Sequence, residues 1–345
     1  MKRFWTWVTL APAALLVGGI AIGLFAGPLD AQPKTVLVAK KVAAPPPFEP
    51  ALAGPWQSAP ELEVTVRGGR NLPEGKTDVK LRALYTSDTI YFLVRYKDAT
   101  HSLKRSPWVK QADGSWKQLK DPNDKGGDNN LYYEDKFAML WNISSPAFEA
   151  KGCMSACHTG EGKPFGNKYT KDPGERFDMW HWKSVRTDPV GQIDDQYVDN
   201  TRYDPEKAKE AGRKSDPKTG GGYVDNVSAD KKGPQFALKG NKPAPPYWIL
   251  DAEKEPFDDS KYKPGDEVPA IVIAPLTGDR GDISAKSAWK DGVWTIVFSR
   301  KLVTGSEFDV QFNEPKKQHA FGVAVFDNAA VRHAYSLGVL KLALE

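Results

Sequence analysis

Cysteine is nearly absent from this chain of 345 residues, which contains only Cys153 and Cys157. The fold is therefore not held together by several disulfide bonds, as many small exported domains are. Charge of one sign is also scarce, because 48 basic and 44 acidic residues leave a formal net charge of +4. This near-neutral balance, without a basic stretch interleaved with aromatic residues, argues against nucleic-acid binding. The sequence also lacks a phosphate-binding glycine loop, a G-x-S-x-G motif and a pair of catalytic carboxylates, so the two cysteines stand out.

The two cysteines run directly into a histidine, in residues 153–158 (CMSACH). Covalent haem attachment ordinarily uses C-x-x-C-H, in which both thiols bond to the haem and the histidine binds the iron. Here one more residue separates the thiols. A local disulfide, half of a zinc site and a catalytic thiol pair are the alternatives, but no second cysteine pair is present to complete a zinc tetrahedron. We therefore predict one covalent haem c, bonded to Cys153 and Cys157, with His158 as the proximal iron ligand. A second, non-covalent haem is compatible with the sequence.

The N-terminus indicates export. Lys2 and Arg3 precede an apolar run over residues 4–26. A signal-peptide core has about 7–15 apolar residues and a membrane-spanning helix about 20, so this run is long enough to span. The positive charges before it predict a single-pass protein of the inner (cytoplasmic) membrane, with the haem domain in the periplasm or outside the cell. Cleavage after Ala26 or Ala31 is the alternative.

We expect three parts along the chain. Residues 1–30 form the membrane anchor or signal sequence, residues 31–50 a tether rich in proline and alanine, and residues 51–345 the haem-binding domain. The tether ends in Ala-Ala-Pro-Pro-Pro, which favours an extended, semi-rigid spacer.

Short segments of alternating or β-branched residues recur outside the middle of the chain and predict strands. These segments are residues 61–66, 89–96, 136–141, 270–274, 292–298 and 321–326. Turn signals between such segments favour a mainly β fold, an antiparallel β-sandwich. Residues 152–246 are polar and show little alternation, so we expect a loop and short-helix insertion that carries the haem. One helix is expected near residues 175–185 and another from Asp204, a residue type that caps helices.

Few residues are available as the second iron ligand, because the chain has five histidines and four methionines. A six-coordinate haem usually takes a second histidine or a methionine. His101 and His319 occur in polar loop sequence and are expected to be solvated, whereas Met139 is expected in the core. The remaining candidates are Met179, His181 and His333.

Several segments resemble the haem-binding domain of the ethylbenzene dehydrogenase family: residues 177–183, 291–300, 321–328 and 332–336. The resemblance extends over about residues 54–345 and implies an antiparallel β-sandwich. The family includes membrane-linked c-type cytochromes and γ subunits of molybdenum enzymes related to dimethyl sulfoxide reductase. In those γ subunits the haem is b-type, with methionine and lysine ligands. His333 stands about where that lysine would be, so the resemblance makes His333 the leading distal ligand and Met179 the alternative.

Two more residues, Trp180 and His181, are expected to contact the cofactor, by stacking on the porphyrin or by bonding to a propionate. The expected function is a membrane-anchored cytochrome that transfers single electrons between redox proteins of the membrane or periplasm, including respiratory complexes. One alternative is a haem-carrying γ-type subunit of a molybdopterin oxidoreductase or of a quinol-oxidising complex. Another is a haem sensor or peroxidase with an open distal site. By itself the protein is expected to carry electrons rather than to act as an enzyme.

Overall fold

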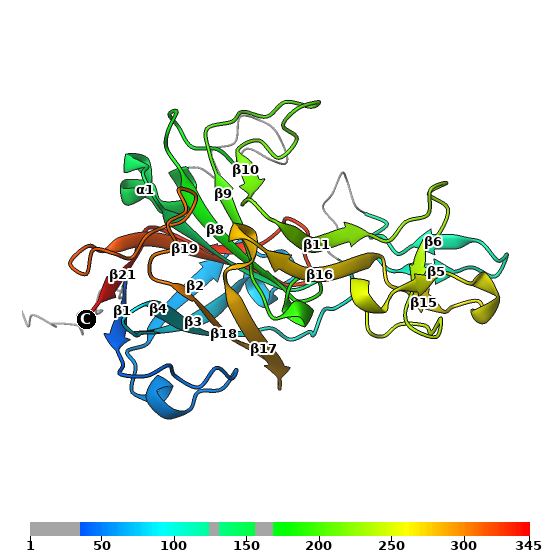
Figure 1. Ribbon diagram of the computed structural model, residues 1–345, viewed down its shortest axis with the longest axis horizontal. Coiled ribbons are helices and arrows are strands. Elements are labelled where there is room, and N and C mark those ends of the chain that lie inside the picture. Colours follow the sequence, from blue (N-terminus) through cyan, green and yellow to red (C-terminus); the bar gives the residue numbers. More distant parts are fainter. Residues whose placement is uncertain (1–34, 124–130, 156–167) are drawn as a thin grey trace, which may run out of the picture. The chain divides into compact units, whose positions relative to one another are not determined.

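Strands make up most of the regular structure in the computed structural model, which describes residues 35–123, 131–155 and 168–345. Most of the strands join one large sheet of 13 strands (Figure 1). Within these described residues α1 (Pro146–Lys151) is the one α-helix, and no helix is long and apolar enough to cross a membrane. The predicted anchor, residues 1–30, lies outside the described part of the chain.

One half of the large sheet is a run of five neighbouring antiparallel strands. In spatial order these are β10 (Arg213–Ser215), β9 (Asp194–Val198), β8 (Phe177–Lys183), β7 (Lys136–Asn142) and β19 (His319–Phe326).

The other half is a second antiparallel run of five strands. In order these are β2 (Leu62–Arg67), β3 (Lys76–Tyr85), β4 (Thr89–Lys97), β18 (Val293–Lys301) and β17 (Ser284–Lys290). β20 (Ala334–Ser336) joins the halves by pairing with β19 and β2. A second connection runs through β21 (Leu340–Leu344) and β1 (Val36–Lys41), which lie side by side in parallel (Figure 1).

The two halves share one core of aromatic and aliphatic side chains. Phe92 of β4 lies 5.7 Å from Trp180 of β8, and Trp294 of β18 lies 4.8 Å from Trp182, measured between ring centroids. Each fully buried Phe stabilises the fold by about 1.5–3 kcal/mol relative to an exposed one. On the far side of β4, Tyr91 and Leu93 pack against Trp56, a residue of the short 3-10 helix η1 (Gly54–Gln57).

Small sheets accompany the large one. They contain β11 (Gly220–Asp225), β16 (Ile271–Thr277) and β13 (Ile249–Leu250); β15 (Glu267–Val268), β5 (Trp108–Lys110) and β6 (Trp116–Gln118); and β12 (Phe236–Ala237) with β14 (Glu255–Pro256).

The mainly β, antiparallel fold is confirmed, and each of the six strand segments predicted from the sequence overlaps an observed strand. The predicted tether is wrong for Val36–Lys41, because these residues pair with two strands of the large sheet. The helix predicted near residues 175–185 is also wrong, since β8 occupies Phe177–Lys183 and, with β9, belongs to the large sheet.

The second predicted helix is wrong as well. Asp204 does cap the amide groups of Glu206 and Lys207, each at 2.8 Å, but the residues that follow form turns. Asp and Asn side chains stabilise such local turns as readily as they stabilise the start of a helix. Asp204 therefore makes the predicted capping hydrogen bonds, but they stabilise a turn and not a helix.

Candidate functional site

β8 divides its side chains between two buried faces of the sheet. Because successive side chains of a strand point to opposite sides, Trp180 and Trp182 enter the shared core, whereas Phe177 and Met179 join a separate apolar cluster. His181 lies on the side of Met179. We call this side of β9, β8, β7 and β19 the outer face.

Cross-strand partners form two adjacent rows on the outer face: Met179, Leu140 and Gly322, followed by His181, Ala138 and Ala324. Three of these six residues have no side chain or only a methyl group. Few side-chain atoms of these strands therefore cover the middle of the outer face, between β8 and β19.

Cys153 approaches this face from the end of α1. Gly152, at φ 56°, starts the 3-10 helix η3 (Gly152–Ser155) so close to Gly338 that an added Cβ would lie 2.5 Å from its carbonyl oxygen. The Cys153 side chain is buried and belongs to the same apolar cluster as Met179. A Cβ on Gly322 would lie 2.3 Å from Cys153 Sγ, so the glycine makes room for the sulfur. Cys157 and His158 lie outside the described residues.

His181 is buried on the outer face, where neither ring nitrogen has a hydrogen-bond partner among the described residues. The side chain is 5% exposed, and its ring centroid lies 5.4 Å from that of Phe326. Burial, followed by the positive charges of Lys183 and Lys136, holds the pKa of His181 well below its ordinary value. The ring is therefore neutral near pH 7 and retains a lone pair, as a metal-ligating imidazole must.

His333 contacts the same phenylalanine. Its ring centroid lies 4.5 Å from that of Phe326, and its Nδ1 lies 2.7 Å from Val331 O. A carbonyl oxygen can only accept, so Nδ1 carries a proton, and Nε2 is the ring nitrogen whose lone pair can bind a metal when the ring is neutral. Metal-binding histidines are commonly oriented by such a bond to the backbone.

Beyond these histidines, the same side of the sheet becomes polar. Lys183 forms a buried ion pair with Asp194, which also accepts hydrogen bonds from Tyr223 (2.8 Å) and Arg280 (2.6 Å). Burial alone would raise the pKa of Asp194, but Lys183 and Arg280 outweigh it and hold this pKa below its ordinary value. Lys136 donates to a backbone carbonyl at 2.9 Å, and its ammonium lies 4.1 Å from the centroid of a phenyl ring. Sequence reasoning missed this network, because nothing in the local pattern marks these residues as buried.

Other candidates lie apart from the outer face. Trp180 packs in the shared core on the opposite side of β8, 4.8 Å from the guanidinium of Arg300. Met139 is confirmed as a core residue. The expectation of a solvated His319 is wrong: this first residue of β19 is 2% exposed, and its ring meets that of Phe312 edge-on, with 4.9 Å between the centroids.

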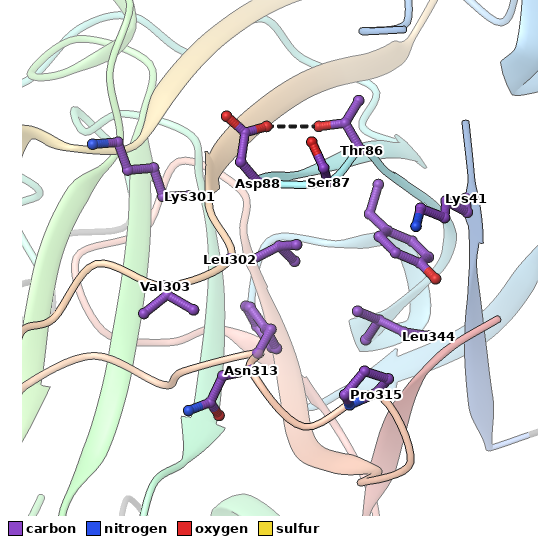
Figure 2. A pocket seen from close by; sticks show the side chains of 12 residues that line it. Lys41, Thr86, Ser87, Asp88, Lys301, Leu302, Val303, Asn313, Pro315 and Leu344 are labelled. Carbon is purple, nitrogen blue, oxygen red and sulfur yellow. Dashed lines mark hydrogen bonds between the residues drawn. The ribbon is translucent and has the colours of Figure 1, made fainter. Parts of the chain in front are cut away.

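A hollow of about 630 Å³ opens elsewhere, between the ends of several strands (Figure 2). Lys41, Lys301 and Leu344 line it, together with Asp88, which accepts a hydrogen bond of 2.9 Å from Thr86. Of the residues predicted to bind haem, none that the structure describes lines this hollow.

Solved structures similar to this chain are few and distant. A protein from Bacteroides uniformis described as carbohydrate-binding shares 11% identity at a TM-score of 0.38, covering 90% of this chain and 99% of its own. A family 9 carbohydrate-binding module from Caldicellulosiruptor kristjanssonii shares 8% identity in complexes with cellotriose (TM-score 0.33, 90% and 94% covered) and with glucose (0.34, 90% and 96%). TM-scores this low support no argument about fold or function.

A comparison with curated proteins finds no match. The family model described as ethylbenzene dehydrogenase, in contrast, matches residues 53–337, which are most of the chain and nearly all of its described part. This protein therefore belongs to the ethylbenzene dehydrogenase family.

Proposed function

We propose that this protein is a c-type cytochrome that binds one covalent haem on its outer face and transfers single electrons between redox partners. The observation that carries the proposal is the position of Cys153. The first thiol of the C-x-x-x-C-H motif lies against Gly322, in an apolar cluster that also contains Met179. His181, which has no hydrogen bond within the described part of the chain, lies in the next row of the sheet.

The side chains present fit a haem. Cys153 and Cys157 would form the thioether bonds, and His158 would bind the iron from the proximal side. The apolar cluster around Cys153 would exclude water from the macrocycle, and the buried Lys183–Asp194 ion pair lies at the other end of the same side. A bound haem would supply reversible one-electron oxidation and reduction, and the protein would set its potential through burial and hydrogen bonding.

For the distal ligand we propose His333, through Nε2. Its hydrogen bond to Val331 O favours this nitrogen as the metal-binding one. The His333 ring contacts Phe326, on the same strand β19 whose Gly322 contacts Cys153. Met179, which shares the cluster of Cys153, is the alternative ligand.

A pyridine haemochrome assay combined with intact-mass measurement tests the attachment. We expect one haem per chain, added covalently, and a strong loss of attachment in Cys157→Ala. A chain that carries no covalent haem after expression with a cytochrome c maturation system would refute the proposal.

Absorption and paramagnetic resonance spectra test the distal ligand. His333→Ala should convert a low-spin haem into one with an open coordination position, while His181→Ala and Met179→Leu should stay low-spin. Loss of the low-spin signal in Met179→Leu alone would move the assignment to Met179.

The family match favours a second candidate function. As a haem-carrying γ-type subunit of a molybdopterin oxidoreductase, the protein would pass electrons to or from a catalytic subunit that performs the substrate chemistry. Affinity purification from the native membrane, followed by metal analysis, separates the two: stoichiometric molybdenum and iron–sulfur clusters favour the subunit. A lone protein favours the free cytochrome. The same fractionation tests whether the chain is held in the inner membrane by residues 1–30, as we propose.

A further inference from the structure

Five aspartates from distant parts of the chain meet on the core side of β8 and β9, away from the outer face. They are Asp178 on β8, Asp195 on β9, Asp216 directly after β10, Asp279 in the 3-10 helix η7 (Asp279–Gly281), and Asp309 between β18 and β19. We call them the acidic cluster. Their carboxylates form two trios that share Asp309, and within each trio one oxygen from each residue lies within 4.8 Å of the others.

Several of these carboxylates are buried with unused oxygens. Asp195, Asp216 and Asp309 are at most 2% exposed. Oδ2 of Asp195 and both oxygens of Asp216 and Asp309 have no hydrogen-bond partner among the described residues. A carboxylate pays a large desolvation penalty when it is buried without a donor or a counter-ion. The unused oxygens therefore point to a ligand that neutralises them.

The protein provides too little positive charge for this purpose. Arg300, fully buried, contacts the cluster at 2.9 Å from Asp178 and 3.6 Å from Asp309. It supplies one positive charge against five carboxylates.

We propose that the acidic cluster binds calcium. Oxygen-only ligands select a hard cation over zinc or copper, which prefer nitrogen and sulfur. Calcium takes 6–8 oxygens at about 2.3–2.6 Å in irregular geometry, so oxygens on opposite sides of the ion lie up to about 5 Å apart, as they do here. Magnesium demands a strict octahedron and retains water, which suits a buried cage of protein carboxylates less well. The ion would tie β8, β9, the end of β10, η7 and the β18–β19 connection together.

The test uses the full chain, stripped of metal with a chelator and dialysed. Isothermal titration calorimetry with calcium chloride should detect at least one ion per chain. Thermal unfolding should shift upward by about 4 °C at a free calcium concentration one hundred times the dissociation constant. Absence of both effects would overturn the proposal. An equal shift at the same concentration of magnesium would overturn the choice of calcium.

Two variants locate the site. Asp309→Asn and Asp216→Asn should each lose most of the calcium-dependent shift. In chelator they should unfold at or above the temperature of the unmodified chain, because an uncharged amide replaces a buried acidic group that has no hydrogen-bond donor among the described residues. Asp113→Asn, in an exposed turn before β6, is the matched control and should keep the full shift. A full calcium shift in Asp309→Asn would place the ion elsewhere and refute the assignment.

Discussion

Replacing Gly322 by alanine tests the contact on which the proposed haem site depends. The added methyl carbon would lie 2.3 Å from Cys153 Sγ and 3.3 Å from Ser336 Oγ. Nonbonded heavy atoms normally approach to about 3.5–4.0 Å, so the sulfur must retreat by more than 1 Å from the strand. The structure therefore predicts that Gly322→Ala displaces Cys153 from the outer face.

The magnitude follows from two opposing effects. Overpacking in a tightly packed region costs about 1–3 kcal/mol, while replacing a strand glycine by alanine returns about 0.5–1 kcal/mol of unfolded-state entropy. Together these ranges give a net destabilisation of up to about 2.5 kcal/mol, measured by urea unfolding. Haem per chain, measured by pyridine haemochrome, should fall as well, because the displaced thiol is no longer presented for attachment.

Gly233→Ala is the matched control. A methyl group there would lie 3.7 Å from Trp116, an ordinary contact, so stability should be unchanged or slightly improved. If Gly322→Ala matched the unmodified chain in both stability and haem content, Cys153 would not lie against β19 and the reasoning about the site would fail.

Three further predictions concern the core side of β8. Arg300→Met should destabilise the metal-free protein by about 3–5 kcal/mol in urea unfolding, because Asp178 loses its buried counter-ion. Trp180→Phe should cost about 1–2 kcal/mol but leave the haem spectrum unchanged, since Trp180 lies on the opposite face of β8 from Met179; a shifted spectrum would contradict this. In chelator, burial raises the pKa of Asp216 to about 9 and that of Asp282 to about 7, so the folded state keeps protons that the unfolded chain releases. Stability should therefore fall as the pH rises from about 4 to about 9, and calcium should reduce this loss; a stability that rises over this range would refute it.

Strands could be predicted from the sequence wherever alternating or β-branched residues formed one continuous segment. β4 and β18 are examples, because β-branched and aromatic residues dominate both. β1 escaped detection because it is short and directly precedes a proline run that indicates a spacer. His319 looked solvated because lysine and glutamine precede it, yet it is the first residue of a buried strand.

The candidate site could be predicted only for residues that lie close together in the sequence, at a spacing typical of a known motif. The C-x-x-x-C-H motif is local, and it directed attention to Cys153 from the sequence alone. The acidic cluster, by contrast, draws on five segments between Asp178 and Asp309, and no spacing in any one of them resembles a metal-binding loop. Its members are brought together by sheet order and by the connection after β18, which are properties of the tertiary fold.

The burial of β8 on both faces explains why its sequence wrongly predicted a helix. Both of its faces are buried, so hydrophobicity does not alternate along Phe177–Lys183 and the helical period was an equally good description. The type of side chain alternates along β8 instead. Aspartate and two tryptophans occupy the core side, and phenylalanine, methionine, histidine and lysine occupy the outer side. A strand buried on two sides can thus carry two unrelated sites: on β8 the proposed haem face, with Met179, and the proposed calcium ligand Asp178 belong to adjacent residues. The choice between helix and strand in such a segment is better made by asking whether residue types, rather than hydrophobicity, repeat with a period of two.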